Sequence, residues 1–248
     1  MSPGFLADFT VQRAAFEVRI ELELHQGQVL ALMGPSGAGK STIVSAIAGL
    51  ERIDAGRISL DGTVLAGDGV HLPPHRRSIG LLGQEPNLFP HLDARANIAF
   101  GARAAGMAKA AALALAEQWL ERIGLPGMAP RKPAELSGGQ RQRVALARAL
   151  AAGPRMLMVD EPFVSLDVEA AADMRTLLRH ELDRTKTRTI VISHSAVDAV
   201  ELADELIVIE HGSVVQRGQV RHVLAQPQTR FVRAVAATLP AADDPARG

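Results

Sequence analysis

Residues 34–42 form a turn of the kind that binds phosphate groups. They follow a short apolar run, precede a helical pattern, fit G-x-x-x-x-G-K-[ST], and read Gly34-Pro35-Ser36-Gly37-Ala38-Gly39-Lys40-Ser41-Thr42. Glycines in such a loop let the backbone wrap phosphates with its N–H groups pointing inward. We expect Lys40 to reach the β- and γ-phosphates of a nucleotide, Ser41 to ligate Mg²⁺ and Thr42 to support the α-phosphate.

A second turn suited to phosphate stands where a polar loop becomes a helix. It consists of Ser137, Gly138, Gly139 and Gln140, within the run 136–143. Its serine hydroxyl and backbone N–H groups lie at the positive end of a helix, which attracts anions. Two different phosphate-binding turns in one chain need an explanation, because the first turn already cradles one nucleotide.

Two carboxylates, Asp160 and Glu161, directly follow an apolar strand pattern at residues 156–159. In a parallel sheet, strand ends meet at the edge where the phosphate loop lies. We expect Asp160 to hold the Mg²⁺ shell through water and Glu161 to accept a proton from an attacking water. His194 ends another apolar run that reaches the same edge, and we expect it to contact the γ-phosphate.

Gln84 follows Leu81, Leu82 and Gly83, at the point where strand patterns give way to helical ones. A polar group at such a junction can sense Mg²⁺ or water and move the helical part. We therefore expect Gln84 to be a third catalytic group and a metal ligand.

Strand patterns surround these groups. Residues 16–24 alternate apolar and charged side chains, which predicts a half-buried strand with antiparallel neighbours. Residues 29–33 are a continuous apolar run, typical of a strand covered on both faces. Residues 58–65 predict a hairpin around Asp61 and Gly62. Further strands are predicted at residues 156–159, 190–192 and 206–209, with a last hairpin at His211 and Gly212.

Between about residues 85 and 153 the strand patterns stop. Ala-rich segments at residues 107–123 and 139–152 predict helices, and the stripe Ala116, Trp119, Leu120 and Ile123 predicts core packing. We expect an α/β fold: a P-loop NTPase core with a mostly parallel sheet, an N-terminal antiparallel β part and an inserted α-helical subdomain. In this prediction residues 1–240 form a single domain and residues 241–248 a flexible tail.

Composition limits the classes of function. The 248 residues include 27 Lys+Arg and 27 Asp+Glu, a balance that argues against nucleic acid as a partner. The chain has no cysteine, which excludes disulfides and thiolate chemistry and fits a reducing cytoplasm. The first residues lack a signal-peptide pattern, and no apolar stretch approaches the roughly 18 residues of a membrane helix. Any association with a membrane is expected to pass through a partner.

These motifs, in this order, resemble the nucleotide-binding subunit of ABC transporters over nearly the whole chain. The matching positions follow in chain order. Residues 34–42 resemble Walker A, Gln84 the Q-loop glutamine, residues 137–140 the family signature, Asp160 and Glu161 Walker B with its catalytic glutamate, Asp167 the D-loop aspartate, and His194 the switch histidine.

The resemblance implies a use for the second turn. In this family two subunits pair head to tail, and each ATP lies between the P-loop of one subunit and the signature turn of the other. The implied activity is ATP hydrolysis with Mg²⁺. The implied partners are a second copy of the chain, transmembrane permease subunits and, indirectly, a solute-binding protein, at the cytoplasmic face of the membrane. The helical lobe with the signature turn is then the part that moves.

Some positions depart from the family pattern. Ser195 stands where many relatives have Asp, Val164-Ser165 stand where Ser-Ala is usual, and Gly83 replaces a common aromatic residue. The chain has no Tyr, so stacking on adenine falls to Phe9 or Phe16, or is weak.

Residues 72–77 and 86–92 resemble the importer branch that serves oxyanions, iron or thiamine. The loop before Leu72 and the triplet Ser193-His194-Ser195 are similar to those of molybdate importers, although thiamine importers share the triplet. We expect an oxyanion such as molybdate to be the solute, with thiamine, iron or sulfate as alternatives. A C-terminal ligand-sensing domain is not expected, and feedback of that form should be absent.

An apolar cluster interrupts the polar loop after Gln84. Its members either pack inward or form a groove that accepts a helix of the membrane subunit. They are Leu88, Phe89, Pro90 and Leu92.

Functions of other classes fit less well. A non-transport ABC ATPase acting on nucleic acid or ribosomes usually shows a long coiled-coil insertion, fused tandem cassettes or a basic surface, and none is present in the sequence. A P-loop kinase or GTPase does not explain the signature turn, and the base-reading motif Asn-Lys-x-Asp is missing. Glu161 and His194 together argue against a module that binds ATP without hydrolysing it.

Overall fold

The computed structural model describes residues 4–13 and 16–239. The tail expected at residues 241–248 lies outside them. Among the described residues, no helix is both long enough and apolar enough to cross a membrane.

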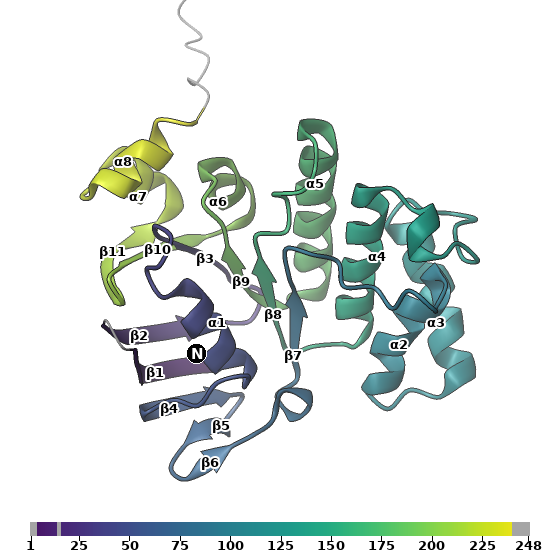
Figure 1. Cartoon of the computed structure of the whole chain (residues 1–248), viewed down its shortest axis with the longest axis horizontal. Coiled ribbons are helices and arrows are strands. Elements are labelled where there is room, and N and C mark those ends of the chain that lie inside the picture. The colour runs from purple at the N-terminus through teal and green to yellow at the C-terminus, as the bar shows by residue number, and fades with distance from the viewer. Residues whose placement is uncertain (1–3, 14–15, 240–248) are drawn as a thin grey trace, which may run out of the picture.

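An antiparallel sheet with the strand order β2-β1-β4-β5-β6 forms one side of the molecule (Figure 1). Its strands are β1 (Phe5–Gln12), β2 (Glu17–Leu24), β4 (Ala55–Leu60), β5 (Thr63–Gly67) and β6 (Val70–His71). Every second residue of β2 is buried, as its alternating pattern predicts. Asp61 and Gly62 have φ of +48° and +78°, which confirms the predicted β4–β5 hairpin.

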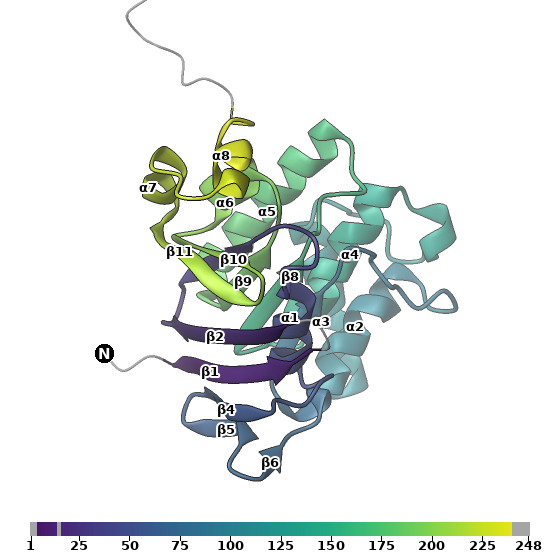
Figure 2. The same cartoon turned by 60° about the vertical axis from the view of Figure 1, so that its left-hand side comes forward.

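A second sheet, with the order β11-β10-β3-β9-β8-β7, carries the loops of the candidate site (Figure 2). Neighbouring strands are parallel except β10 and β11, which form the predicted last hairpin. The strands are β3 (Val29–Met33), β7 (Ile79–Leu82), β8 (Met156–Asp160), β9 (Arg188–Ile192), β10 (Glu205–Glu210) and β11 (Ser213–Gln219). The carboxyl ends of the parallel strands therefore meet at one edge.

Helix α1 (Lys40–Ala48) packs in a core that joins the antiparallel sheet to one face of the parallel sheet. Leu30 and Leu32 of β3 face this core, whereas Ala31 and Met33 face the opposite side. There they meet α6 (Ala196–Leu202), α7 (Val220–Ala225) and α8 (Arg230–Ala236). The continuous apolar run in β3 is explained by this cover on both faces.

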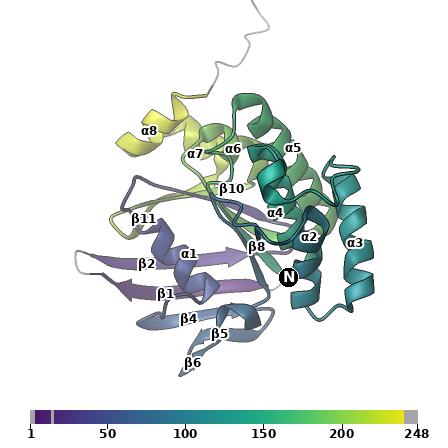
Figure 3. The same cartoon turned by 45° about the vertical axis from the view of Figure 1, so that its right-hand side comes forward.

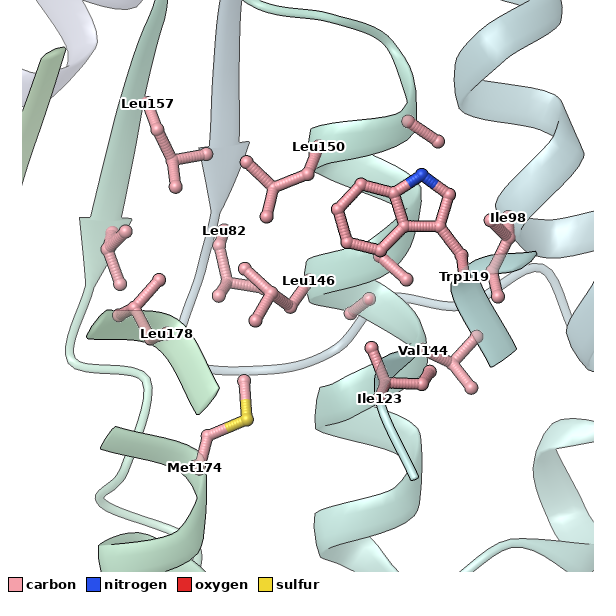
Figure 4. Packing of buried hydrophobic residues seen from close by; sticks show 14 of the residues in the cluster. Leu82, Ile98, Trp119, Ile123, Val144, Leu146, Leu150, Leu157, Met174 and Leu178 are labelled. Carbon is pink, nitrogen blue, oxygen red and sulfur yellow. The ribbon is translucent and has the colours of Figure 1, made fainter. Parts of the chain in front are cut away.

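From β7 to β8 the described chain is helical and contains α2 (Ala94–Ala104), α3 (Lys109–Arg122) and α4 (Gly138–Ala151). These helices lie beside α5 (Val168–Thr185) at one end of the molecule (Figure 3). Trp119 is 3% exposed and packs in one core with Leu150 of α4 and Leu157 of β8, which confirms the predicted stripe (Figure 4). Gly101 lets α2 approach α4, since a Cβ there would lie 2.0 Å from the Arg148 carbonyl oxygen.

Arg77 is a buried cation that closes the C-terminal end of α1. It is 1% exposed, and its Nη1 donates to the carbonyl oxygens of Ala46 (2.8 Å) and Ile47 (2.9 Å). Its Nε donates to the carbonyl oxygen of Leu72 (2.8 Å). These oxygens lie at the negative end of the helix or in the adjoining loop, where a cation is stabilised.

Replacing this guanidinium should destabilise the fold. Arg77→Met leaves three carbonyl oxygens without their donors, and we expect the free energy of unfolding to fall by about 3 kcal/mol. Urea denaturation measures the change, with the exposed neighbour Arg76 replaced by Met as the control, for which we expect a change within about 0.5 kcal/mol. Equal stabilities of the two variants would show that Arg77 does not hold α1.

Candidate functional site

The phosphate loop leaves β3 and enters α1, as the sequence predicts. Gly39 precedes α1 with φ +106°, and a Cβ there would lie 2.9 Å from a methyl group of β2. A Cβ on Gly34 would lie 2.1 Å from the carbonyl oxygen of Ile209, so β10 packs directly against the loop. Lys40 Nζ donates to the carbonyl oxygens of Gly34 (2.6 Å) and Pro35 (3.0 Å). The lysine ammonium is thus held inside the loop.

Three charged groups meet beside this loop. Burial lowers the pKa of Lys40, although the carboxylates of Glu161 and Asp160 oppose the shift. Burial also raises the pKa of Asp160, as does the neighbouring Glu161, while Lys40 lowers it. Charges affect one another in this way only at short range. The structure therefore brings together the lysine of the loop and both carboxylates at the end of β8.

Glu161 has a backbone conformation that few residues other than glycine adopt, with φ +47°. Its N–H donates to the carbonyl oxygen of Ile192 at the end of β9 (2.9 Å). Its Oε1 lies 3.4 Å from Nδ1 of His194, and both side chains remain partly exposed. Strained backbone of this kind is found at functional sites. The pair can accept a proton and contact a phosphate at the sheet edge.

Side chains on α5 and α6 hold the loop that carries His194. Ser193 Oγ donates to Asp198 Oδ2 (2.6 Å) and accepts from the Ser195 N–H (3.0 Å). Asp198 Oδ1 also accepts from Arg175 Nη1 (3.2 Å). Burial raises the pKa of Asp198, against these two donors. Ser195 Oγ accepts from the Asp198 N–H (3.4 Å), so the residue that departs from the family pattern is the N-cap of α6.

A cavity of about 380 Å³ opens beside the phosphate loop and is lined by Arg13, Phe16 and residues of the run 37–42. Arg13 Nη2 donates to Thr42 Oγ1 (2.9 Å) and pairs with Glu51 (2.5 Å). Phe9 is 1% exposed within the core between the two sheets, so the suggestion that it stacks on adenine is wrong. Phe16 is the aromatic residue that lines the cavity.

Gln84 is exposed and lies toward the start of α4. It lines a small pocket with Gly138, Arg141 and Pro162. The structure thus places it between the signature turn and the segment after Glu161. Its roles as a catalytic group and as a metal ligand stay predictions.

The signature turn borders a separate cavity of about 490 Å³. Ser137 caps α4 by accepting from the Gln140 N–H (3.2 Å), and Gln140 Oε1 accepts from the Ser137 N–H (2.9 Å). Asp167 caps α5 by accepting from the Ala170 N–H (2.8 Å). These caps and the side chain of Arg143 line the cavity, whereas residues 34–42 do not. Two helix N-termini thus face a cavity that is distinct from the phosphate loop and is also lined by Arg143 and the carboxylates of Asp167, Glu169 and Asp173.

The family model described as "ABC transporter" matches residues 18–164, which is more than half of the chain. The chain belongs to the ABC transporter family. The phosphate loop, Gln84, the signature turn and the Asp160–Glu161 pair all lie inside the matched range. Asp167 and His194 follow it.

Curated relatives in this ABC family are import ATP-binding proteins. The chain is 44% identical to "Molybdenum import ATP-binding protein ModC" of Mycobacterium tuberculosis, over 86% of this chain and 59% of that one. It is 43% identical to "Sulfate/thiosulfate import ATP-binding protein CysA" of Synechococcus elongatus, over 86% and 61%. It is 42% identical to "Fe(3+) ions import ATP-binding protein FbpC" of Streptomyces coelicolor, over 86% and 60%. The aligned part thus spans about three fifths of each of these relatives.

A solved ABC structure has the same fold. It is the dimeric post-hydrolysis state of the ATP-binding cassette MJ0796, bound to ADP and Pi. The likeness has a TM-score of 0.72 at 27% identity and covers 88% of this chain and 98% of that one. The predicted combination of a P-loop α/β core, an antiparallel β part and a helical region is therefore the fold of an ABC ATPase.

The residues of this ABC chain fit a magnesium ion. Ser41 and Asp160 offer the oxygen ligands that Mg²⁺ prefers. Burial and the adjacent Glu161 raise the pKa of Asp160, and Lys40 lowers it, so a cation beside this carboxylate favours its charged form. A bound Mg²⁺ would neutralise charge on the nucleotide phosphates.

Several contacts of the site escape sequence reasoning. Arg13 and Arg175 are distant in the sequence from the residues that they contact, Thr42 and Asp198, and nothing in the sequence around them indicates these contacts. A buried glutamine inside the signature helix is the feature that a helical-face count could have found, because Gln142 falls on the apolar face of α4.

Proposed function

We propose that two copies of this chain pair head to tail and hydrolyse ATP between the phosphate loop of one copy and the signature turn of the other. The observation that carries the proposal is the cavity at the signature turn, called the signature cavity below. Ser137 and Asp167 line this cavity, and the phosphate loop does not. Two helix N-termini suit a phosphate group. In this proposal that phosphate belongs to a nucleotide that the phosphate loop of the other copy binds. The dimeric state named for MJ0796 supports the pairing of two copies.

In each composite site the chemistry is an attack of water on the γ-phosphorus. Glu161 accepts the water proton, the bond from the γ-phosphorus to the bridging oxygen breaks, and ADP and Pi leave. Lys40 and His194 contact the γ-phosphate, and Ser137 of the other copy contacts it from the opposite side. The strained backbone of Glu161 and its contact with His194 support this role for the carboxylate.

We further propose that hydrolysis powers solute import through permease subunits at the cytoplasmic face of the membrane. Of the apolar cluster after Gln84, Leu88 packs inward against the helical core and does not form a groove. Phe89 instead pairs with Phe100, with ring centroids 4.5 Å apart, and Arg148 lies over the Phe89 ring. Phe100 is 45% exposed and Leu81 43%. This half-exposed aromatic pair is a suitable seat for an apolar helix of the permease.

The proposed solute is an oxyanion such as molybdate. Relatives with molybdenum and with sulfate/thiosulfate names are both 44% identical to this chain, and a relative named for iron is 42% identical. Thiamine and iron remain alternatives. Specificity resides in the binding protein and the permease, so the residues of this chain do not decide among them.

Reconstitution with its permease and binding protein tests the import proposal. ATPase activity is measured in proteoliposomes with molybdate, sulfate, thiamine or ferric iron, with Glu161→Gln as the inactive control. We expect stimulation by molybdate above the other solutes. Stimulation by another of the four would correct the solute, and stimulation by none would refute the importer assignment.

A further inference from the structure

Gln142 is a buried polar side chain that joins three functional segments. It lies on α4 and is 2% exposed. Its Nε2 donates to the carbonyl oxygen of Gly83 (3.3 Å), which precedes Gln84. The same nitrogen donates to the carbonyl oxygen of Pro162 (3.1 Å), which follows Glu161. One amide of the signature helix thus bonds the backbone next to Gln84 and the backbone next to Glu161.

The segment after Gly83 has a second attachment to the same helix. Arg148 donates to the carbonyl oxygens of Asn87 (2.8 Å) and Pro86 (2.9 Å). Helix α4 and this segment are therefore expected to shift together. Gln142 adds the link from this unit to Pro162. The bond from Gln142 to Pro162 is buried, so breaking it leaves an unpaired polar group inside the protein.

The link reaches a residue whose backbone needs support. Glu161 holds φ +47°, a conformation that persists only when its surroundings fix it. Its N–H is fixed by Ile192, and the carbonyl of the next residue is fixed by Gln142. A shift of α4 along this bond therefore changes the placement of the carboxylate.

The N-terminal end of α4, close to Gln142, is the signature turn. The capping box of Ser137 and Gln140 forms its first turn, and Gln142 stands within the next residues of the same helix. A short helix segment transmits displacement as a rigid body. A phosphate bound at Ser137 thus acts on the position of Gln142.

We infer that Gln142 is a positioning residue that couples the signature turn of a chain to Glu161 of the same chain. The inference rests on the proposed head-to-tail dimer. In that dimer the signature turn contacts the nucleotide of one site, and Glu161 serves the other site. Gln142 therefore lets ATP in one site set the hydrolysis rate in the second, which makes the two sites interdependent.

The test replaces the amide by an apolar side chain of similar length, Gln142→Met. We expect kcat to fall about tenfold, because the hydrogen bond that holds Pro162 next to Glu161 is lost together with the bond to Gly83. ATP binding to the monomer should stay within about twofold of the parent, since Gln142 does not line the phosphate loop cavity. The Hill coefficient for ATP should fall toward 1.

Gln216→Met is the matched control. Gln216 is also a buried glutamine whose Nε2 donates to a carbonyl oxygen, that of Gln226 (2.9 Å), but it lies on β11. Both variants should lose stability in urea denaturation, and the control should keep the parent kcat and Hill coefficient. Gln142→Asn, which keeps the amide and shortens the side chain, is the second variant if the Met variant does not fold, and we expect it to lower kcat in the same direction.

The double variant with Glu161→Gln separates positioning from assembly. With ATP, the Glu161→Gln variant and the double variant Glu161→Gln/Gln142→Met should both sediment as dimers. A parent-like kcat in Gln142→Met, or loss of the ATP dimer when residue 142 changes, would overturn the inference. A single Glu161→Gln variant that stays monomeric with ATP would instead refute the dimer on which the inference rests.

Discussion

A Glu161→Gln chain is expected to bind ATP as the parent does, to hydrolyse it roughly 10³-fold more slowly and to accumulate as an ATP-bound dimer. Glutamine keeps the size of the side chain but cannot take a proton from water. The phosphate loop, including Lys40, is unchanged and still binds the nucleotide. Phosphate release measures the rate, and analytical ultracentrifugation with ATP measures the dimer.

The control for this variant is Glu117→Gln. Glu117 pairs with Arg95 on the surface of the helical region and should leave the rate at the parent value. If Glu161→Gln hydrolyses ATP at the parent rate, another group accepts the proton, and the strained backbone of Glu161 serves a different purpose.

A Ser137→Arg chain is expected to lose dimer-dependent ATP hydrolysis while its monomer still binds ATP. The long cation fills the signature cavity and blocks the γ-phosphate of the other copy. The loss of the α4 cap costs about 1 kcal/mol, which the fold tolerates. Nucleotide binding is measured by equilibrium dialysis below the dimerisation concentration, and turnover by phosphate release above it.

Thr229→Arg provides a matched control for the charge and the lost cap. Thr229 caps α8 by accepting from the Val232 N–H (3.2 Å). Helix α8 is distant along the chain from the residues that line either cavity. Its turnover should equal that of the parent. Loss of ATP binding in the Ser137→Arg monomer would mean that the signature turn serves the nucleotide of its own chain.

The residues predicted from the sequence are those whose role follows from local pattern. Lys40 stands in a loop motif between a strand and a helix, and Asp160 ends a buried strand, so the parallel-sheet rule places both at one edge. The hairpin at Asp61 follows from turn chemistry in the same way. The sequence does not predict strand β7 or helix α2, because a run of four apolar residues is ambiguous and Gly101 weakens a helical pattern.

Contacts between distant segments were beyond the sequence. Phe9 and Phe16 are both aromatic residues ahead of the phosphate loop, yet only the fold shows that Phe9 is enclosed between two sheets. The bonds of Gln142 and the arrangement of Ser193, Asp198 and Arg175 join residues from separate elements. Their geometry depends on packing, which no spacing along one chain encodes.

Mixing two inactive chains tests most directly whether the nucleotide site is shared between copies. Lys40→Ala removes the phosphate-loop cation, and Ser137→Arg blocks the signature turn, so each chain alone should be inactive. In a mixed dimer, the intact phosphate loop of one copy faces the intact signature turn of the other.

The measurement is the ATP hydrolysis rate of an equal mixture of the two chains. We expect between about a fortieth and about a quarter of the parent rate: a quarter because half of the dimers are mixed and each has one intact site, and up to about tenfold less because the blocked signature turn no longer positions Glu161 of its own chain through Gln142. The control is an equal mixture of the parent with a chain that carries both substitutions. Neither site of its mixed dimers is intact, so its ATP hydrolysis comes from the parent dimers alone. A mixture of the single variants that remains inactive would contradict a site built from two copies.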